Sequence, residues 1–321
     1  MKCLFCGRQI ETNATEEEKE CLWHNKCIKK FFGTKNMPIL DISESKLEEI
    51  AKNTINNGFT VPGVQKKLSL NLSGGAKSRL TIVNYPTGYI LKPQTNEFAF
   101  LPELEDLSMR LAEIVGIRTV PHALIKVDDT YAYITRRIDR DINIKNDDVK
   151  MYAMEDFCQL SNRLTQDKYK GSYELCGKVI KKYSEYPQLD MAEMFIRIVF
   201  SFVIGNSDMH LKNFSLRETL PGNRIYSLSD AYDLLPVNII MPEDTEQLAL
   251  TINGKKRNIR KKDFLELAQK CNINPKSAEN MIKKICKIQE VLLLVCDNSY
   301  LPDELKERTK ELIKQRINVI K

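Results

Sequence analysis

The stretch Gly205-Asn206-Ser207-Asp208-Met209-His210-Leu211-Lys212-Asn213-Phe214-Ser215-Leu216 decides the fold class of this chain. It follows directly on the most apolar segment of the sequence, residues 194–205, in which Arg197 is the only charged residue. That segment is too short to span a bilayer, so we expect it to form a helix buried in the core. The polar residues after it are therefore expected in a loop that leaves the end of a buried helix.

Asp208 and Asn213 lie five residues apart in this loop. Protein kinases place a catalytic aspartate five residues before a Mg²⁺-binding asparagine, in a loop after a buried helix. The aspartate accepts or orients the proton of the attacking hydroxyl, and the asparagine oxygen binds a metal that bridges the phosphates. A second Mg²⁺ carboxylate is needed one hairpin later, and Asp233 fits that position after a strand expected at 224–228, although the DFG letters are absent.

Two upstream residues complete this kinase pattern. Lys92 ends a strand expected at 89–91 and could pair with nucleotide phosphates, while Glu105 could anchor it from a helix expected at 102–115. Each match alone is a weak signal, because a single aspartate after a strand is usually a turn residue and a single lysine–glutamate pair is usually on the surface. The order of the parts along the chain is what favours a kinase.

The periodicity of the sequence changes near residue 138. Before it, an alternating segment predicts a strand at 68–72, and further strands are expected at 80–83, 120–127 and 131–135. After it, the pattern is mainly helical, with helices expected at 152–163, 172–183, 190–205, 261–271, 275–296 and 302–318. We therefore predict an α+β, bilobal, protein-kinase-like fold with a cleft between the lobes. The expected parts are a cysteine-rich zinc-knuckle segment (1–33), a small β-rich N-lobe (34–137) and a larger helical C-lobe (138–321).

The composition is that of an ordinary globular chain. Hydrophobic residues make up 42% and charged residues 29%, and the net charge is 49 − 43 = +6. This mild basicity suits an anionic ligand such as ATP but does not by itself indicate nucleic-acid binding. No secretory signal is visible, and nine cysteines without one favour reduced thiols in the cytoplasm.

Some of these cysteines have the spacing of a metal site. Cys3-x-x-Cys6 is a knuckle, and Cys21, His24 and Cys27 follow at intervals of three. A closed tetrahedral zinc site needs four ligands. We prefer Cys3, Cys6, His24 and Cys27, and the alternative replaces Cys27 by Cys21. The alternative to a zinc site is a segment whose cysteines are free thiols and bind no metal.

The loop at 205–216 resembles the catalytic loop of HipA-family kinases, most closely that of the short HipT members. Other stretches resemble motifs of the same family in the same order. They are residues 63–68 (the signature near the phosphate loop), 90–93 (the nucleotide-lysine strand), 136–140 (the interlobe hinge) and 231–235 (the second metal motif). The resemblance covers the chain from about Phe59 to its carboxyl end.

The resemblance implies a role for each matching residue. Asp208 would be the catalytic base, with Lys212 reaching the γ-phosphate and His210 holding the loop by hydrogen bonds. The remaining roles are Mg²⁺ binding by Asn213 and Asp233, phosphate binding by Lys92 steadied by Glu105, and contact with the adenine or ribose by Asp139. Family members also autophosphorylate a serine before the Gly-x-Gln signature, where this chain has Thr60 and, in place of a second serine, Pro62.

The same resemblance implies a biological setting. It is that of an ATP- and Mg²⁺-dependent serine/threonine kinase of a bacterial type II toxin–antitoxin system, acting on an aminoacyl-tRNA synthetase or a similar translation protein. A separate small antitoxin is implied, because the short systems carry the amino-terminal subdomain of full-length members as a separate polypeptide. Direct DNA contact is expected only through the antitoxin, and no membrane association is expected.

Three rival readings remain at this stage. The chain could be a catalytically silent pseudokinase that acts as a partner- or nucleic-acid-binding module, although the intact kinase residues argue against it. It could be a zinc-dependent nucleic-acid binder, although the basic runs 255–257 and 260–262 are short and typical of a solvated face. It could also be a kinase for a small molecule or lipid, which the site residues do not exclude.

Overall fold

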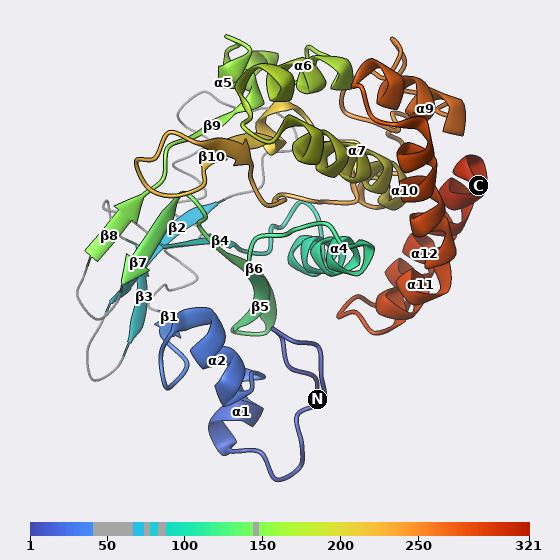
Figure 1. Ribbon diagram of the computed structural model, residues 1–321. Helices are drawn as coiled ribbons and strands as arrows, with labels where there is room; N and C mark the ends of the chain where they lie inside the picture. The colour runs from blue at the N-terminus through green and yellow to red at the C-terminus, as the bar shows by residue number, and fades with distance from the viewer. Residues whose placement is uncertain (41–66, 74–77, 83–87, 144–147) are drawn as a thin grey trace. The chain divides into compact units, whose positions relative to one another are not determined.

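The structure is a computed structural model that describes residues 1–40, 67–73, 78–82, 88–143 and 148–321 (Figure 1). The chain divides into two compact units. We call Met1–Asp106 with Pro121–Lys150 the sheet unit, and Leu107–Val120 with Met151–Lys321 the helical unit. Helix α4 (Leu101–Val115) contributes residues to both.

The sheet unit is built on a six-stranded sheet with the strand order β1-β3-β2-β4-β6-β5. Its strands are β1 (Ile39–Leu40), β2 (Leu68–Ser73), β3 (Arg79–Ile82), β4 (Tyr89–Lys92), β5 (His122–Val127) and β6 (Thr130–Arg136). All neighbouring pairs are antiparallel except β1 with β3. β4 faces β6 so that Tyr89 lies opposite Arg136 and Lys92 opposite Tyr133. Because side chains alternate along a strand, Tyr89 and Lys92 point to opposite faces of the sheet.

The amino-terminal segment packs against this sheet. It contains α1 (Glu16–Cys21), which begins with a capping box between Thr15 and Glu18, and α2 (Asn25–Phe32), which ends at Gly33 in the left-handed conformation (φ 75°). Trp23, Phe31 and Phe32 are buried in an aromatic cluster with Tyr89. The Trp23 indole donates a hydrogen bond to the Leu124 carbonyl (3.1 Å), so the segment shares the core of the sheet unit.

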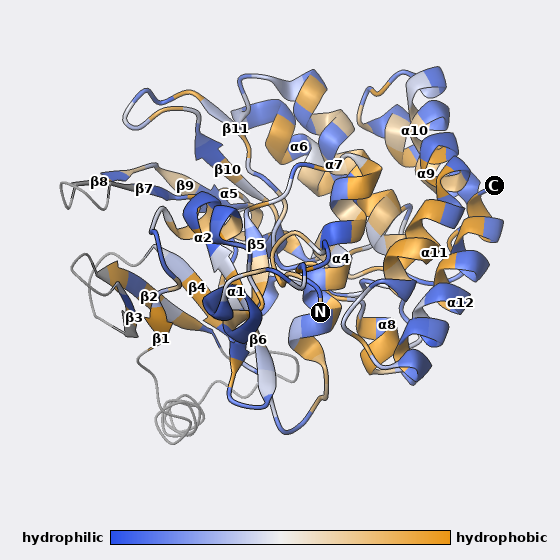
Figure 2. Ribbon diagram, turned by 90° about the horizontal axis from the view of Figure 1, so that it is seen from below, coloured by the Kyte–Doolittle hydropathy of each residue, from blue (hydrophilic) through white to orange (hydrophobic). Residues whose placement is uncertain are grey.

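The helical unit is organised around α7 (Pro187–Ile204), which is buried almost all round. Its other long helices are α6 (Tyr173–Tyr183), α9 (Lys261–Lys270), α10 (Pro275–Lys287), α11 (Gln289–Asp297) and α12 (Asp303–Ile320). Of these, α6, α10 and α12 pack directly on α7. Figure 2 shows apolar and polar residues alternating around these helices, as expected for helices with one face in a core.

Two smaller sheets complete the described fold. Strands β9 (Met154–Asp156), β10 (Ser215–Glu218) and β11 (Tyr226–Leu228) form an antiparallel sheet in the helical unit. Strand β7 (Arg140–Asn143) pairs with β8 (Asp148–Met151). The short elements are α5 (Phe157–Leu160), η1 (Thr165–Asp167), η2 (Leu211–Asn213) and α8 (Val237–Ile240).

The α+β fold class and the buried helix before residue 205 are confirmed, but two expected helices are wrong in detail. Residues 152–163 form β9 and the four-residue α5, because β9 pairs with β10 and Asp156 caps the helix that follows. Residues 275–296 are two helices, since Ile288 leaves the helical conformation (ψ 14°). Among the described residues, no helix is both long enough and apolar enough to cross a membrane.

Candidate functional site

The loop at residues 205–213 begins at a glycine that the backbone requires. Gly205 ends α7 with φ 74°, a conformation that residues with a Cβ adopt at a cost. A Cβ atom here would lie 2.5 Å from Leu312 Cδ2. The chain therefore turns out of the buried helix at the one residue type that fits both the backbone and the space.

Asp208 is held from both sides of the loop. Its backbone N–H donates to the side-chain oxygen of the buried Asn206 (3.1 Å), and the Tyr169 hydroxyl donates to its Oδ1. Burial, and then the nearby charge of Asp208, raise the pKa of Tyr169, so this hydroxyl keeps its proton. The Asp208 side chain is about a third exposed (32%), which leaves the carboxylate oriented yet accessible.

His210 and Lys212 have different surroundings in this loop. The buried His210 ring packs edge-on against Tyr169, with Nε2 4.0 Å from Asp208 Oδ1. Lys212 Nζ forms an ion pair with Asp156 Oδ2 at 2.6 Å. The predicted roles of His210 in holding the loop and of Lys212 in catalysis stay predictions.

Asn213 and Asp233 are brought towards Asp208 by hydrogen bonds. Asn213 donates from Nδ2 to the Asp208 carbonyl (3.0 Å), which leaves its amide oxygen as a potential ligand. The Tyr232 hydroxyl donates to the Lys212 carbonyl (3.1 Å) and so ties the Asp233 segment to the loop. Asp233 lies at φ 60°, and its charge, after that of Asp208, contributes to the raised pKa of Tyr169.

The segment before Asp233 is supported by the buried helix α7. Arg197, fully buried, donates from Nη2 to the Ser229 carbonyl (2.8 Å) and forms an ion pair with Glu193 (2.9 Å). This explains the only charge in the apolar segment. An unpaired buried guanidinium would be costly, and here it satisfies the backbone next to the candidate metal ligand.

In the sheet unit, Lys92 and Glu105 form a buried ion pair. The distance from Lys92 Nζ to Glu105 Oε1 is 2.6 Å, with side chains only 4% and 1% exposed. The ammonium also lies 5.4 Å from the centroid of the Tyr133 ring. Removing one partner of such a pair leaves an uncompensated buried charge, so the two residues are expected to act as a unit.

Asp139 lies between β6 and β7 and is held by two arginines. Arg137 binds it with two hydrogen bonds (2.9 and 2.7 Å), and Arg140 adds a third (2.9 Å). Burial alone would raise the pKa of Asp139, but the two guanidinium groups outweigh it and lower the pKa to about 2. The carboxylate is therefore charged at neutral pH and largely occupied by these contacts.

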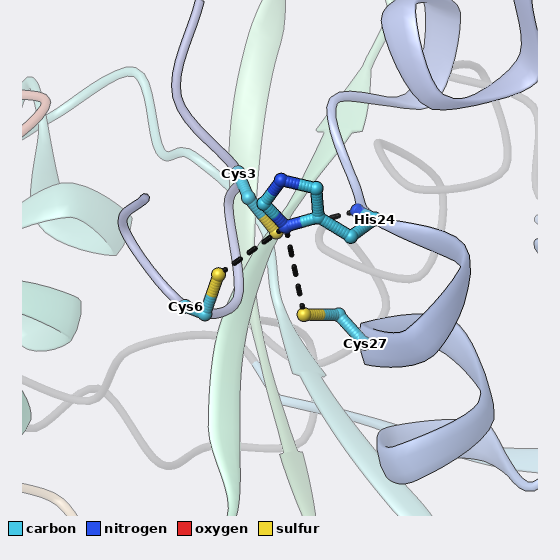
Figure 3. Close-up of side chains that lie close together, drawn as sticks. All are labelled: Cys3, Cys6, His24 and Cys27. Carbon is cyan, nitrogen blue, oxygen red and sulfur yellow. Dashed lines mark hydrogen bonds between the residues drawn. The ribbon is translucent and has the colours of Figure 1, made fainter. Parts of the chain in front are cut away.

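Figure 3 shows Cys3 and Cys6 from the first turn of the chain meeting His24 and Cys27 at the start of α2. One ligand atom from each residue lies within 4.8 Å of all the others, and His24 Nδ1 is 3.4 Å from Cys6 Sγ and 3.8 Å from Cys27 Sγ. Zinc bonds of about 2.0–2.3 Å would place a nitrogen and a sulfur about 3.5 Å apart. The four residues fit a tetrahedral metal site.

Neighbouring contacts prepare these groups for a metal. His24 Nε2 lies 3.0 Å from the Gln9 carbonyl, which favours a proton on Nε2 and leaves Nδ1 free to ligate. Burial would raise the pKa of Cys6, but hydrogen bonds from the Arg8 backbone and from the other site residues outweigh it and lower the pKa to about 7. The alternative ligand Cys21 points to the Trp23 carbonyl (3.8 Å) and lies outside the group.

Several supporting residues were not foreseen. Tyr169, Asn206 and Tyr232 each hold a candidate site residue, and Asp156 pairs with Lys212. Of these, Asn206 and Tyr232 lie inside the kinase-like motifs at 205–216 and 231–235, whereas Tyr169 and Asp156 carry no local pattern that marks them. Thr60 and the signature at 63–66 lie outside the described residues.

A strand-borne lysine paired with a helix glutamate, together with an aspartate–asparagine loop after a buried helix, defines a protein-kinase-like fold. The family model of the HipA-like C-terminal domain matches residues 59–292. The chain therefore belongs to the HipA-like C-terminal domain family.

Curated relatives agree with this class. The chain is 32% identical over 234 residues to a protein of Sinorhizobium fredii named "Putative kinase Y4dM", covering 68% of this chain and 55% of that protein. It is 25% identical over 271 residues to a Haemophilus influenzae protein named "Putative kinase", covering 76% of this chain and 77% of the relative. The chain thus spans about half the length of the Sinorhizobium relative.

Solved structures show the same fold. HipA of Shewanella oneidensis MR-1, solved in complex with HipB and operator DNA, matches with a TM-score of 0.68 at 20% identity, over 81% of this chain and 64% of HipA. The Helicobacter pylori proinflammatory kinase CtkA matches with a TM-score of 0.53 at 16% identity, over 75% of this chain and 90% of CtkA. At these identities the likeness concerns the fold.

Proposed function

We propose that this chain is an ATP- and Mg²⁺-dependent serine/threonine protein kinase of a bacterial type II toxin–antitoxin system. The observation that carries the proposal is the Asp208 loop, in which Tyr169, Asn206 and Asn213 hold a carboxylate that is about a third exposed, while the charge of Asp233 acts on the same Tyr169 hydroxyl. Family membership and relatives described as kinases support the reaction class.

The proposed roles follow from the chemistry of each side chain. Asp208 takes the proton of the attacking hydroxyl while that oxygen bonds to the γ-phosphorus and ADP leaves. Asn213 and Asp233 offer the oxygen ligands that Mg²⁺ prefers, and the ion supplies charge neutralisation on the phosphates. Lys92, held by Glu105, binds the phosphates. Lys212 assists in catalysis from its ion pair with Asp156, and Asp139 positions the nucleotide.

The amino-terminal site is proposed to hold structural Zn²⁺ on Cys3, Cys6, His24 and Cys27. Four protein ligands leave no open position, which excludes catalysis by the ion and favours a role in fixing the segment to the sheet. We also propose that the chain consists of a zinc knuckle (1–33), a kinase N-lobe (34–137) and a kinase C-lobe (138–321). The proposed location is the cytoplasm, and the proposed autophosphorylation site is Thr60.

The substrate and partners are proposed from the family. HipA of Shewanella oneidensis was solved with its antitoxin HipB and DNA, which supports a separate small antitoxin for this chain and DNA contact through that antitoxin. The proposed substrate is a translation protein such as an aminoacyl-tRNA synthetase.

The test is phosphoryl transfer by the purified chain. Incubation with Mg²⁺ and ATP is expected to add phosphate to the wild type, measured by intact mass and peptide mapping, and not to Asp208→Ala. Asp303→Asn, which changes an almost fully exposed acid of α12, serves as the matched control and is expected to behave as wild type.

The rival is a catalytically silent pseudokinase. It would bind ATP without transferring phosphate to itself or to proteins of a lysate, and Asp208→Ala would then match the wild type in every assay. That outcome would overturn the kinase proposal. Absence of ATP binding, measured by thermal shift, would also overturn the kinase proposal and would favour a pseudokinase or a zinc-dependent binding module.

A further inference from the structure

A small basic pocket lies in the sheet unit, where the end of α2 meets the sheet. Its volume is about 130 Å³. The lining residues are Lys30, Phe31, Phe32, Gly33, Leu72, Gly88, Tyr89, Arg136, Arg137 and Arg140. Four of them are cationic and none is acidic.

The pocket is separate from the proposed nucleotide lysine. Arg136 lies opposite Tyr89 in the β4–β6 register, so both point to the face that α2 covers. Lys92, three residues after Tyr89, points to the other face of the same sheet. A ligand in this pocket would therefore lie on the opposite face of the sheet from Lys92.

The cations of the pocket are only partly neutralised. Asp139 takes hydrogen bonds from Arg137 and Arg140, yet Arg140 Nε is buried without an acceptor among the described residues. Arg136 and Lys30 form no ion pair with any described residue, and Lys30 only approaches the Phe5 ring (5.7 Å). A buried donor without a partner is uncommon in folded proteins, and Arg140 Nε is such a donor in a residue that lines this partly aromatic pocket, whereas Arg136 is half-buried and Lys30 exposed.

We propose that this pocket binds a phosphate monoester, namely a phosphorylated serine or threonine on a protein. Arginine forks match phosphate oxygens, and a wall of Phe31, Phe32 and Tyr89 lowers the local dielectric, which strengthens each charge contact. A compact cavity suits a single terminal phosphate. Nucleic acid, by contrast, calls for a stripe of basic residues that follows an extended backbone.

Binding of O-phosphoserine to the whole chain, measured by isothermal titration at constant ionic strength, tests the pocket. We expect Lys30→Gln and Arg136→Gln each to weaken binding by at least about fivefold, since each removes one charge-assisted contact. Lys126→Gln, an exposed lysine of β5 in the same sheet, is the matched control and is expected to leave binding unchanged. Circular dichroism of each variant checks that the fold is retained.

Three results would overturn the proposal. They are equal binding by wild type, Lys30→Gln and Arg136→Gln, no binding of O-phosphoserine beyond that of serine, and tighter binding of a single-stranded oligonucleotide that depends on the same two residues. The Asp208→Ala chain is expected to bind O-phosphoserine as the wild type does. The kinase proposal and the phosphate-pocket proposal can therefore fail independently, because the Asp208→Ala variant tests only the first.

Discussion

At the scale of single residues, the candidate active loop depends on one glycine and one hydrogen bond. Gly205 allows the chain to turn at the end of α7, and Tyr169 orients the Asp208 carboxylate. Neither residue would transfer a phosphoryl group itself. Both are nevertheless expected to be sensitive positions, because the loop geometry follows from them.

Gly205→Ala is expected to lower the free energy of unfolding by roughly 2–4 kcal/mol. The left-handed backbone costs about 1 kcal/mol, and the new Cβ meets Leu312 at 2.5 Å, a form of overpacking that costs about 1–3 kcal/mol. Urea unfolding measures the change. Gly254→Ala is the control, because it has the same φ of 74° and nothing within 4 Å of the added atom. Equal losses in the two variants would contradict the clash at residue 205.

Tyr169→Phe is expected to slow phosphoryl transfer about tenfold, corresponding to the loss of one hydrogen bond to a charged group. The raised pKa of Tyr169 means that its hydroxyl still donates in alkaline solution, so the wild-type rate should show no alkaline fall from this group. Initial rates of autophosphorylation at several pH values measure both effects. Tyr183→Phe, an exposed tyrosine of α6, is the control. An unchanged rate in Tyr169→Phe would show that this hydroxyl does not position Asp208.

At the scale of elements, the amino-terminal segment joins two features. Helix α2 begins at the candidate zinc ligands His24 and Cys27 and ends at the basic pocket. Its aromatic residues are buried against β4. A metal at the first end would therefore set the position of the second. The segment is too short to bury a sufficient core alone, which is why it leans on the sheet.

Removal of metal is expected to lower the melting temperature and to expose Trp23. The purified chain should hold about one equivalent of zinc, since a closed site uses all four ligands for one ion. Metal analysis and tryptophan fluorescence measure the two effects. Cys6→Ser should lose the zinc, whereas Cys21→Ser should keep it, because that thiol points to the Trp23 carbonyl. Zinc loss in Cys21→Ser with retention in Cys6→Ser would reverse the ligand assignment.

At the scale of the whole molecule, the distribution of charge argues against a general nucleic-acid binder. The net charge is +6, but two lysines of the run 255–257 are paired with acids: Lys255 with Asp263 (2.5 Å) and Lys256 with Glu246 (3.0 Å). Lysines that are already paired with acids attract the phosphates of a nucleic acid only weakly.

The chain is accordingly expected to elute from heparin at low salt. Replacing Lys255 and Lys256 by glutamine should move the elution only slightly, and Lys276→Gln/Lys283→Gln on α10 gives a control with the same change in net charge. Retention to high salt that falls steeply in the Lys255/Lys256 variant would instead favour the nucleic-acid reading.

The sequence by itself determined the order of the parts and the local geometry that short-range rules govern. A run of apolar residues predicts the buried helix α7, and alternation predicts the strand β2, because these signals depend on neighbours in the chain. The spacing of Cys3, Cys6, His24 and Cys27 likewise predicted the group that the structure brings together.

Only the tertiary structure decided which residues distant in the sequence support these elements and the candidate site. Strand β9 replaced a predicted helix because it pairs with β10, some sixty residues later. Tyr169 reaches Asp208 across 39 residues of sequence, and the basic pocket unites α2 with Arg136 across about a hundred. Such contacts arise from packing and pairing between segments that no local pattern relates, so their residues carry no signal until the chain is folded.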